Sequence, residues 1–195
     1  MSAPTLHASP PPVPTAAPKP TGWPLLRLGF RPFYLGAALF ALLAIPLWVA
    51  LFLGHSTLTM PLSPLLWHAH EMLFGFAIAV IMGFLLTAVK AWTGLATPRG
   101  AFLAALALLW LAARVAAVTG PYALYALLDL ALLPLVAAVL TRLLLRARNR
   151  RNLPLAGMLM LLALANGFFH LGVIGAIKMS PLTPLYAALA LIVMI

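Results

Sequence analysis

Cysteine is absent from the chain. Its absence excludes disulfides, iron–sulfur clusters, thiolate-ligated haem and covalently attached c-type haem, which requires a C-x-x-C-H motif. Any haem in this protein would therefore be a noncovalent, b-type haem. Histidine, of which the chain has five, is its expected axial ligand.

Charged residues are scarce as well. They make up 7% of the 195 residues, against about 25% in average soluble proteins, whereas hydrophobic residues make up 65%. This composition predicts an all-α fold, a polytopic transmembrane helical bundle surrounded by the lipid bilayer.

The chain has two acidic residues and twelve lysines and arginines, a formal net charge of +10. The connections around residues 55–63 and 119–121 are nearly uncharged, whereas the cations gather in the segments between them. This alternation follows the positive-inside rule and predicts a cytoplasmic N-terminus. The charge therefore reflects topology and does not indicate a nucleic-acid partner. Ten cations form three groups: Lys19, Arg27 and Arg31; Lys90 and Arg99; Arg142, Arg146, Arg148, Arg150 and Arg151.

Apolar runs predict five complete transmembrane helices and a truncated sixth. Residues 1–27, with seven prolines among the first twenty, are expected to form a disordered cytoplasmic tail before a transmembrane domain at 28–195. The sixth run, about 16 Å long as a helix, is too short to span the hydrocarbon. We therefore expect the chain to be the N-terminal part of a longer protein. The expected helices cover residues 33–53, 64–90, 101–118, 122–145 and 154–177, with the short run at 185–195.

Two histidines and a glutamate stand together at the start of the second helix, where ionisable groups are costly and indicate function. On an α-helix, His68 and His70 lie about 200° apart, whereas His68 and Glu71 share a face. Unless the backbone opens locally, the two histidines should therefore serve different neighbours, for example a metal on one side and a second cofactor on the other. Alternatively, both are hydrated residues at the membrane boundary.

Four helices carry rare ionisable side chains at a similar depth. His70, Arg114, Asp129 and His170 each lie about 20 to 30 Å along the helix from the cations at its cytoplasmic end. A buried site in the outer half of the bilayer is the simplest interpretation. Arg114 and Asp129 would pair with each other, or Arg114 would face a haem propionate. His70 and His170 could ligate haem or copper, or be ordinary core histidines.

Five segments stand out: 28–34 (LGFRPFY), 67–75 (WHAHEMLFG), 83–89 (GFLLTAV), 92–94 (WTG) and 163–171 (ALANGFFHL). Together they resemble the NnrS family. The resemblance implies a bacterial inner-membrane protein that contains haem and copper and acts in the response to nitric oxide and nitrosative stress. It makes His68, His70, Glu71 and His170 candidate ligands and nitric oxide the expected small-molecule partner. It also implies a missing C-terminal half, or an oligomer partner in its place.

The sequence departs from the family pattern at Lys90 and Ala91, where proline and asparagine are expected. Nitric oxide binding or stress protection is a better expectation than catalytic turnover, because no quinone site or proton path is evident. One rival is a proton- or metal-ion-coupled transporter that uses His68, Glu71, Asp129 and His170 as a relay. Another is a structural membrane subunit whose charges pair internally.

Overall fold

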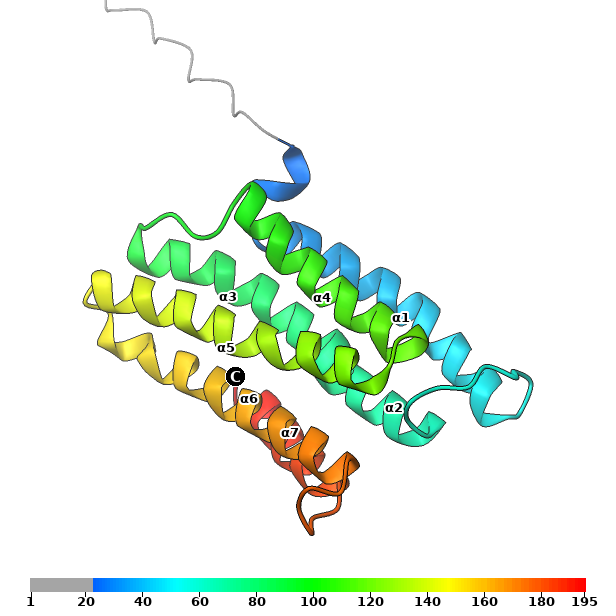
Figure 1. Cartoon of the computed structure of the whole chain (residues 1–195). Coiled ribbons are helices and arrows are strands. Elements are labelled where there is room, and N and C mark those ends of the chain that lie inside the picture. The colour runs from blue at the N-terminus through cyan, green and yellow to red at the C-terminus, as the bar shows by residue number, and fades with distance from the viewer. Residues whose placement is uncertain (1–22) are drawn as a thin grey trace, which may run out of the picture.

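The computed structural model describes residues 23–195, and this part of the chain is helical without any strand. Five spans are long and apolar enough to cross a membrane, with α2, η2 and α3 forming one continuous span. The protein is thus a multi-pass, all-α helical bundle, as predicted (Figure 1). The elements are η1 (Pro24–Leu26), α1 (Phe30–Phe52), α2 (Pro64–His70), η2 (Glu71–Ala77), α3 (Ile78–Thr93), α4 (Ala101–Thr119), α5 (Tyr122–Arg146), η3 (Arg150–Asn152), α6 (Leu153–Val173) and α7 (Leu182–Met194).

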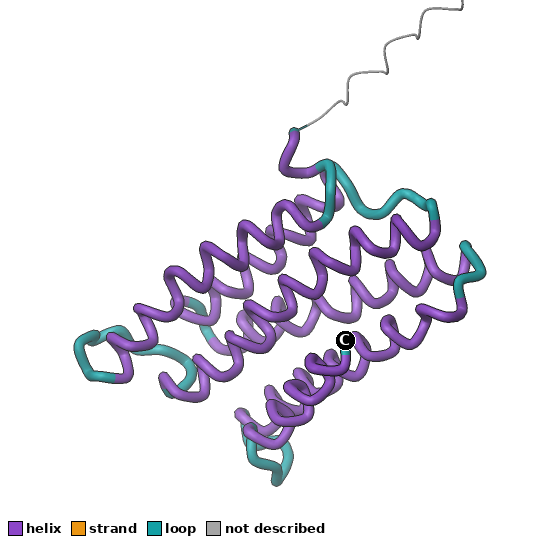
Figure 2. Tube along the Cα trace, turned by 180° about the vertical axis from the view of Figure 1, so that it is seen from behind, coloured by secondary structure: helices purple, strands orange, loops and turns teal. Residues whose placement is uncertain are grey.

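The span from α2 to α3 is the centre of the bundle, with α1 at its periphery. Half of the most apolar stretch of this central span is buried, against 11% for α1. α1 packs on α3, and the chain then continues through the neighbouring pairs α4–α5 and α5–α6, with α7 against α6 (Figures 1 and 2). Side chains on α2, η2, α4, α5 and α6 can therefore meet inside the bundle.

The second helix begins at Pro64, as expected, but it is not regular throughout. Glu71–Ala77 forms a π-helix, η2, between two α-helical segments. A π-helix widens the turn and frees backbone groups, so such segments often occur at functional sites. Here the Gly75 carbonyl accepts a hydrogen bond of 2.9 Å from the indole Nε1–H of Trp110. The sequence predicted one helix over residues 64–90, but it did not indicate this local change in helix type.

The fifth span ends earlier than predicted. α6 stops at Val173 because Gly175 adopts a left-handed conformation (φ 71°), and the Ala176 N–H returns to the Leu171 carbonyl at 3.0 Å. Glycine favours this conformation, which ends a helix. Gly172 also has a specific role: a Cβ there would lie 2.9 Å from the Met179 carbonyl oxygen, so only glycine lets the following loop pass this close.

The predicted N-terminal tail, residues 1–27, lies mostly outside the described residues. Its described end is not a tail: Pro24–Leu26 forms the 3-10 helix η1, and the Gly100 N–H donates to the Leu26 carbonyl at 2.8 Å. Arg31 donates to the Pro24 carbonyl at 2.6 Å, and α1 begins at Phe30, earlier than expected. The Leu26–Gly100 contact attaches the start of the described chain to the α3–α4 connection.

Candidate metal centre

A buried polar cluster lies between four spans of the bundle. Its charged and polar members are the four side chains that the sequence placed at a similar depth in the bilayer, together with Glu71 and Asn166. All are at most 5% exposed. Such groups are tolerated in an apolar bundle only when they are paired or bound to a ligand. The members are His70 from α2, Glu71 from η2, Arg114 from α4, Asp129 from α5, and Asn166 and His170 from α6.

His70 is fully buried at the end of α2 and makes hydrogen bonds through both ring nitrogens. Nε2 lies 2.9 Å from Asn166 Oδ1 and 3.5 Å from Asp129 Oδ2. Nδ1 lies 2.8 Å from the Tyr125 hydroxyl and 3.3 Å from Glu71 Oε1. The orientation of this imidazole is therefore set by partners on three other elements.

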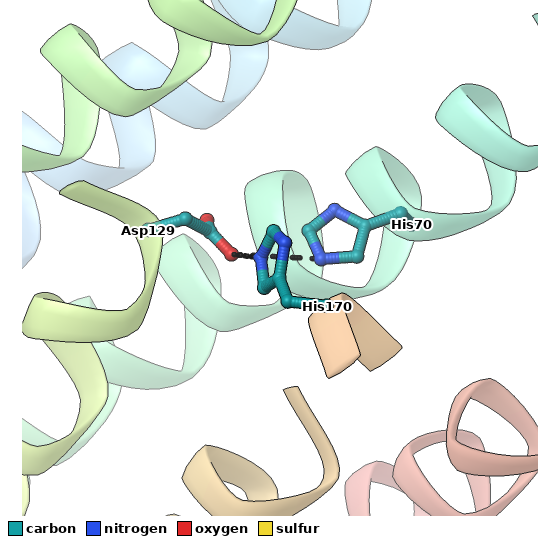
Figure 3. Close-up of side chains that lie close together, drawn as sticks. All are labelled: His70, Asp129 and His170. Carbon is teal, nitrogen blue, oxygen red and sulfur yellow. Dashed lines mark hydrogen bonds and ion pairs between the residues drawn. The ribbon is translucent and has the colours of Figure 1, made fainter. Parts of the chain in front are cut away.

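His170 contacts the same Asp129 carboxylate as His70 (Figure 3). Its Nε2 lies 3.2 Å from Asp129 Oδ2, and its Nδ1 lies 2.7 Å from the Tyr122 hydroxyl. His70, Asp129 and His170 each offer one ligand atom, and these atoms lie within 4.8 Å of one another. Two Nε2 atoms thus converge on one oxygen, while each Nδ1 contacts a tyrosine hydroxyl. Metal-binding histidines characteristically have the second ring nitrogen held in this way.

Arg114 connects the two acidic residues of the chain. Its Nη1 donates to Glu71 Oε2 at 2.8 Å, and its Nη2 donates to Asp129 Oδ1. Asn166 Nδ2 donates to Asp129 Oδ2 at 2.6 Å. Arg114 therefore pairs with Asp129, one of the two alternatives from the sequence, and also with Glu71. Because both Nη atoms are engaged, the alternative haem-propionate contact lacks support from this arrangement.

Gly75 lets the arginine approach the π-helix. A Cβ on Gly75 would lie 2.8 Å from Arg114 Nη1 and 2.9 Å from Glu71 Oε2, so the ion pair fills the space that a side chain would need. The pair therefore depends on a glycine at this position of η2.

His68 lies away from the cluster, as the 200° separation from His70 predicts. Its half-buried ring stacks on the indole of Trp48, with centroids 3.9 Å apart and planes 17° from parallel. His68 Nδ1 is buried and has no hydrogen-bond partner among the described residues. Glu71 faces Arg114 and Tyr125. His68 and Glu71 were expected to share a face, but in the described chain their side chains contact different neighbours.

Sequence analysis missed the two tyrosines and assigned no role to Asn166. Tyr122, Tyr125 and Asp129 follow one another at spacings of three and four, which places them on one face of α5. Two phenol hydroxyls on the face of the only buried aspartate in the described chain were the signal that could have identified them.

Fold and site together define a multi-pass helical membrane protein with a buried histidine–aspartate group able to bind a metal. The family model described as NnrS protein matches residues 24–195, so the chain belongs to the NnrS family, as its motifs indicated. No curated protein and no solved structure gives a match.

Proposed function

We propose that this protein binds copper at His70, Asp129 and His170, carries a noncovalent haem, and acts in the bacterial response to nitric oxide. The observation that carries the proposal is the convergence of two imidazole Nε2 atoms on one buried carboxylate oxygen. Membership in the NnrS family supports the same chemistry.

The donor set fits a single metal ion. Imidazole and carboxylate groups suit copper, iron or zinc, and two histidines with one carboxylate leave coordination positions open for a further ligand. The net charge of the site also favours a bound cation. When the histidines are neutral, the charges of Glu71, Asp129 and Arg114 sum to one negative charge in a buried site. A bound cation would offset that excess, which is otherwise costly in an apolar bundle.

The surrounding residues have defined roles in this proposal. With a metal on Nε2, the ring proton of each histidine sits on Nδ1, where the oxygen of Tyr122 or Tyr125 accepts it. These bonds fix the tautomer and the ring orientation. Phe169 packs beside the His70 ring, with centroids 4.3 Å apart, and helps to exclude water.

A haem does not fit between His70 and His170 in this arrangement. The His70 ring lies against Phe74 and Phe169, at centroid distances of 4.9 Å and 4.3 Å, and Asn166 Oδ1 is 2.9 Å from its Nε2. A macrocycle would have to displace all of these contacts. We therefore assign the haem to His68, which has a half-buried ring and an unpartnered Nδ1. When bound, haem supplies an iron that binds nitric oxide, and copper supplies one-electron chemistry.

The topology part of the proposal is a bacterial inner-membrane protein with its N-terminus in the cytoplasm. The inner-end cations support it: Arg99, Arg142 and Arg146 line one cavity at the end of the bundle where α4 begins and α5 ends. The metal cluster then lies toward the outer side of the membrane.

Metal analysis with optical spectroscopy tests the function. In the purified protein we expect bound copper, and a haem Soret band that shifts when nitric oxide is added to the reduced form. His170→Ala should lose copper and retain haem, whereas His68→Ala should lose haem and retain copper. His55→Ala, in the loop between α1 and α2, is the matched control and should retain both. Protein that folds and binds neither would refute the proposal.

A relay is the alternative that one observation favours. Hydrogen bonds and ion pairs connect the cluster into a continuous network at one level of the bundle, and chains of such residues move protons in transporters. Metal-free preparations that drive pH-dependent flux in liposomes, and lose it in Asp129→Asn, would support this alternative. The path joins Tyr122, His170, Asp129, His70, Tyr125, Glu71 and Arg114.

A further inference from the structure

A basic cavity lies at the end of the bundle where α4 begins and α5 ends. Its volume is about 840 Å³. Arg142 and Arg146 line it from the last two turns of α5, and Arg99 lines it from the connection before α4. All three arginines are exposed. Asp129 of the metal cluster lies about 20 Å from Arg142 along the same helix, so this cavity is separate from the metal site.

The chain contains no carboxylate side chain that could neutralise these arginines. Its two acidic residues are Glu71 and Asp129, and both are buried and paired with Arg114 in the metal cluster. Arg142 and Arg146 stand four residues apart on one face of α5, a spacing at which like charges repel each other. A bound anion would offset this repulsion, so we expect the ligand of the cavity to be negatively charged.

The start of α4 favours an anion at the same place. Arg99 and Gly100 precede the helix, and its first turn has neither an acidic residue nor a side-chain cap. The amino end of a helix carries a partial positive charge, so a neighbouring arginine is unfavourable unless an anion compensates both. Phe102, in this first turn, lines the cavity as well. The positive end of α4 and three arginines therefore border one cavity.

The wall of the cavity changes from basic to apolar toward the interior of the bundle. Val139 also lines it and lies seven residues before Arg146, about 10 Å deeper along α5. Phe102 and Leu145 are apolar lining residues as well, and they are 45% and 55% exposed. A free phosphate ion has no group that could contact these walls. A phospholipid has both a charged headgroup and acyl chains, and it matches both parts of the cavity.

We propose that this cavity binds an anionic phospholipid. The headgroup phosphate accepts hydrogen bonds from Arg99, Arg142 and Arg146, whose planar guanidinium groups suit phosphate oxygens. The acyl chains lie against Phe102 and Val139. This binding requires neither copper nor haem. The site therefore goes beyond the proposed function and can be tested separately from it.

The test measures lipid binding to the full chain in a neutral detergent by native mass spectrometry. Phosphatidylglycerol has a net negative charge and should bind at least about tenfold more tightly than zwitterionic phosphatidylcholine with the same acyl chains. The double variant Arg142→Gln, Arg146→Gln should bind phosphatidylglycerol about thirtyfold more weakly, which corresponds to about 1 kcal/mol for each arginine. Equal affinities of the natural chain for the two lipids would refute recognition of an anionic headgroup.

The matched control is the double variant Arg150→Gln, Arg151→Gln. These arginines are exposed in η3, at the same end of the bundle, and lie outside the cavity. Both double variants remove two positive charges from exposed positions. The control should weaken phosphatidylglycerol binding by no more than about threefold, because solvent screens charges that do not contact the lipid. Equal weakening by the two variants would indicate diffuse attraction and overturn the proposed site.

Inorganic phosphate distinguishes a phospholipid from a soluble phosphate compound. It should fail to displace phosphatidylglycerol at equal concentration, because it lacks the acyl chains. Phe102→Ala, at an exposed position, should weaken phosphatidylglycerol binding severalfold by removing part of the apolar wall. Displacement by an equal concentration of phosphate would assign the cavity to a soluble anion and equally refute a phospholipid site.

Discussion

Replacing Arg114 with leucine should destabilise the protein more than any exposed cation replacement. The substitution removes the arginine that pairs with both Glu71 and Asp129, and it leaves two carboxylates in an apolar interior. Breaking a buried ion pair from one side typically costs about 3–5 kcal/mol. For a domain of this size, the loss corresponds to a fall in melting temperature of roughly 6–20 °C.

The reasoning makes a sharper prediction for a compensated variant. If the cost arises from uncompensated charge, adding Glu71→Gln and Asp129→Asn to Arg114→Leu should recover at least half of the lost stability, because no net charge stays buried. Unfolding is measured in detergent by intrinsic fluorescence, with Arg99→Leu, an exposed position, as control. A compensated variant as unstable as Arg114→Leu alone would show that shape, and not charge, explains the role of the arginine.

Three further predictions concern the groups around the cluster. Trp110→Phe leaves the Gly75 carbonyl without its indole donor and should cost about 1–3 kcal/mol in the same unfolding assay. Gly75→Ala should cost about 1–3 kcal/mol by crowding Arg114, although alanine favours helix; unchanged stability would contradict the close contact. Tyr122→Phe should weaken copper binding about 10–100-fold, measured by competition with a chelator, while the melting temperature changes little, because it removes only the hydroxyl that orients His170.

The convergence of the cluster could be predicted from the sequence because depth along a helix is nearly one-dimensional. A fixed rise per residue converts the distance from the flanking cations into a level in the bilayer. This argument placed His70, Arg114, Asp129 and His170 at one level, and all four are buried together in the structure. The separation of His68 from His70 followed from helical periodicity in the same way.

The partners of each group were harder to predict, because they depend on rotation about the helix axis and on local backbone geometry. The π-helix at Glu71–Ala77 departs from the regular period, and Glu71, its first residue, pairs with Arg114. In the sequence, Tyr122 and Tyr125 are indistinguishable from ordinary aromatic residues of a membrane helix. Only the structure shows that their hydroxyls contact the two histidines.

By itself, the sequence determined that this protein is a multi-pass helical bundle and which spans carry ionisable side chains, since length, hydropathy and charge placement act along one chain. The tertiary structure alone decided that two Nε2 atoms meet one Asp129 oxygen, that Arg114 joins both acidic residues, and that a basic cavity lies between the start of α4 and the end of α5. These features depend on how neighbouring helices rotate and pack against one another. Such packing is decided by the surfaces of two helices together, so it cannot be read from the sequence of either helix alone.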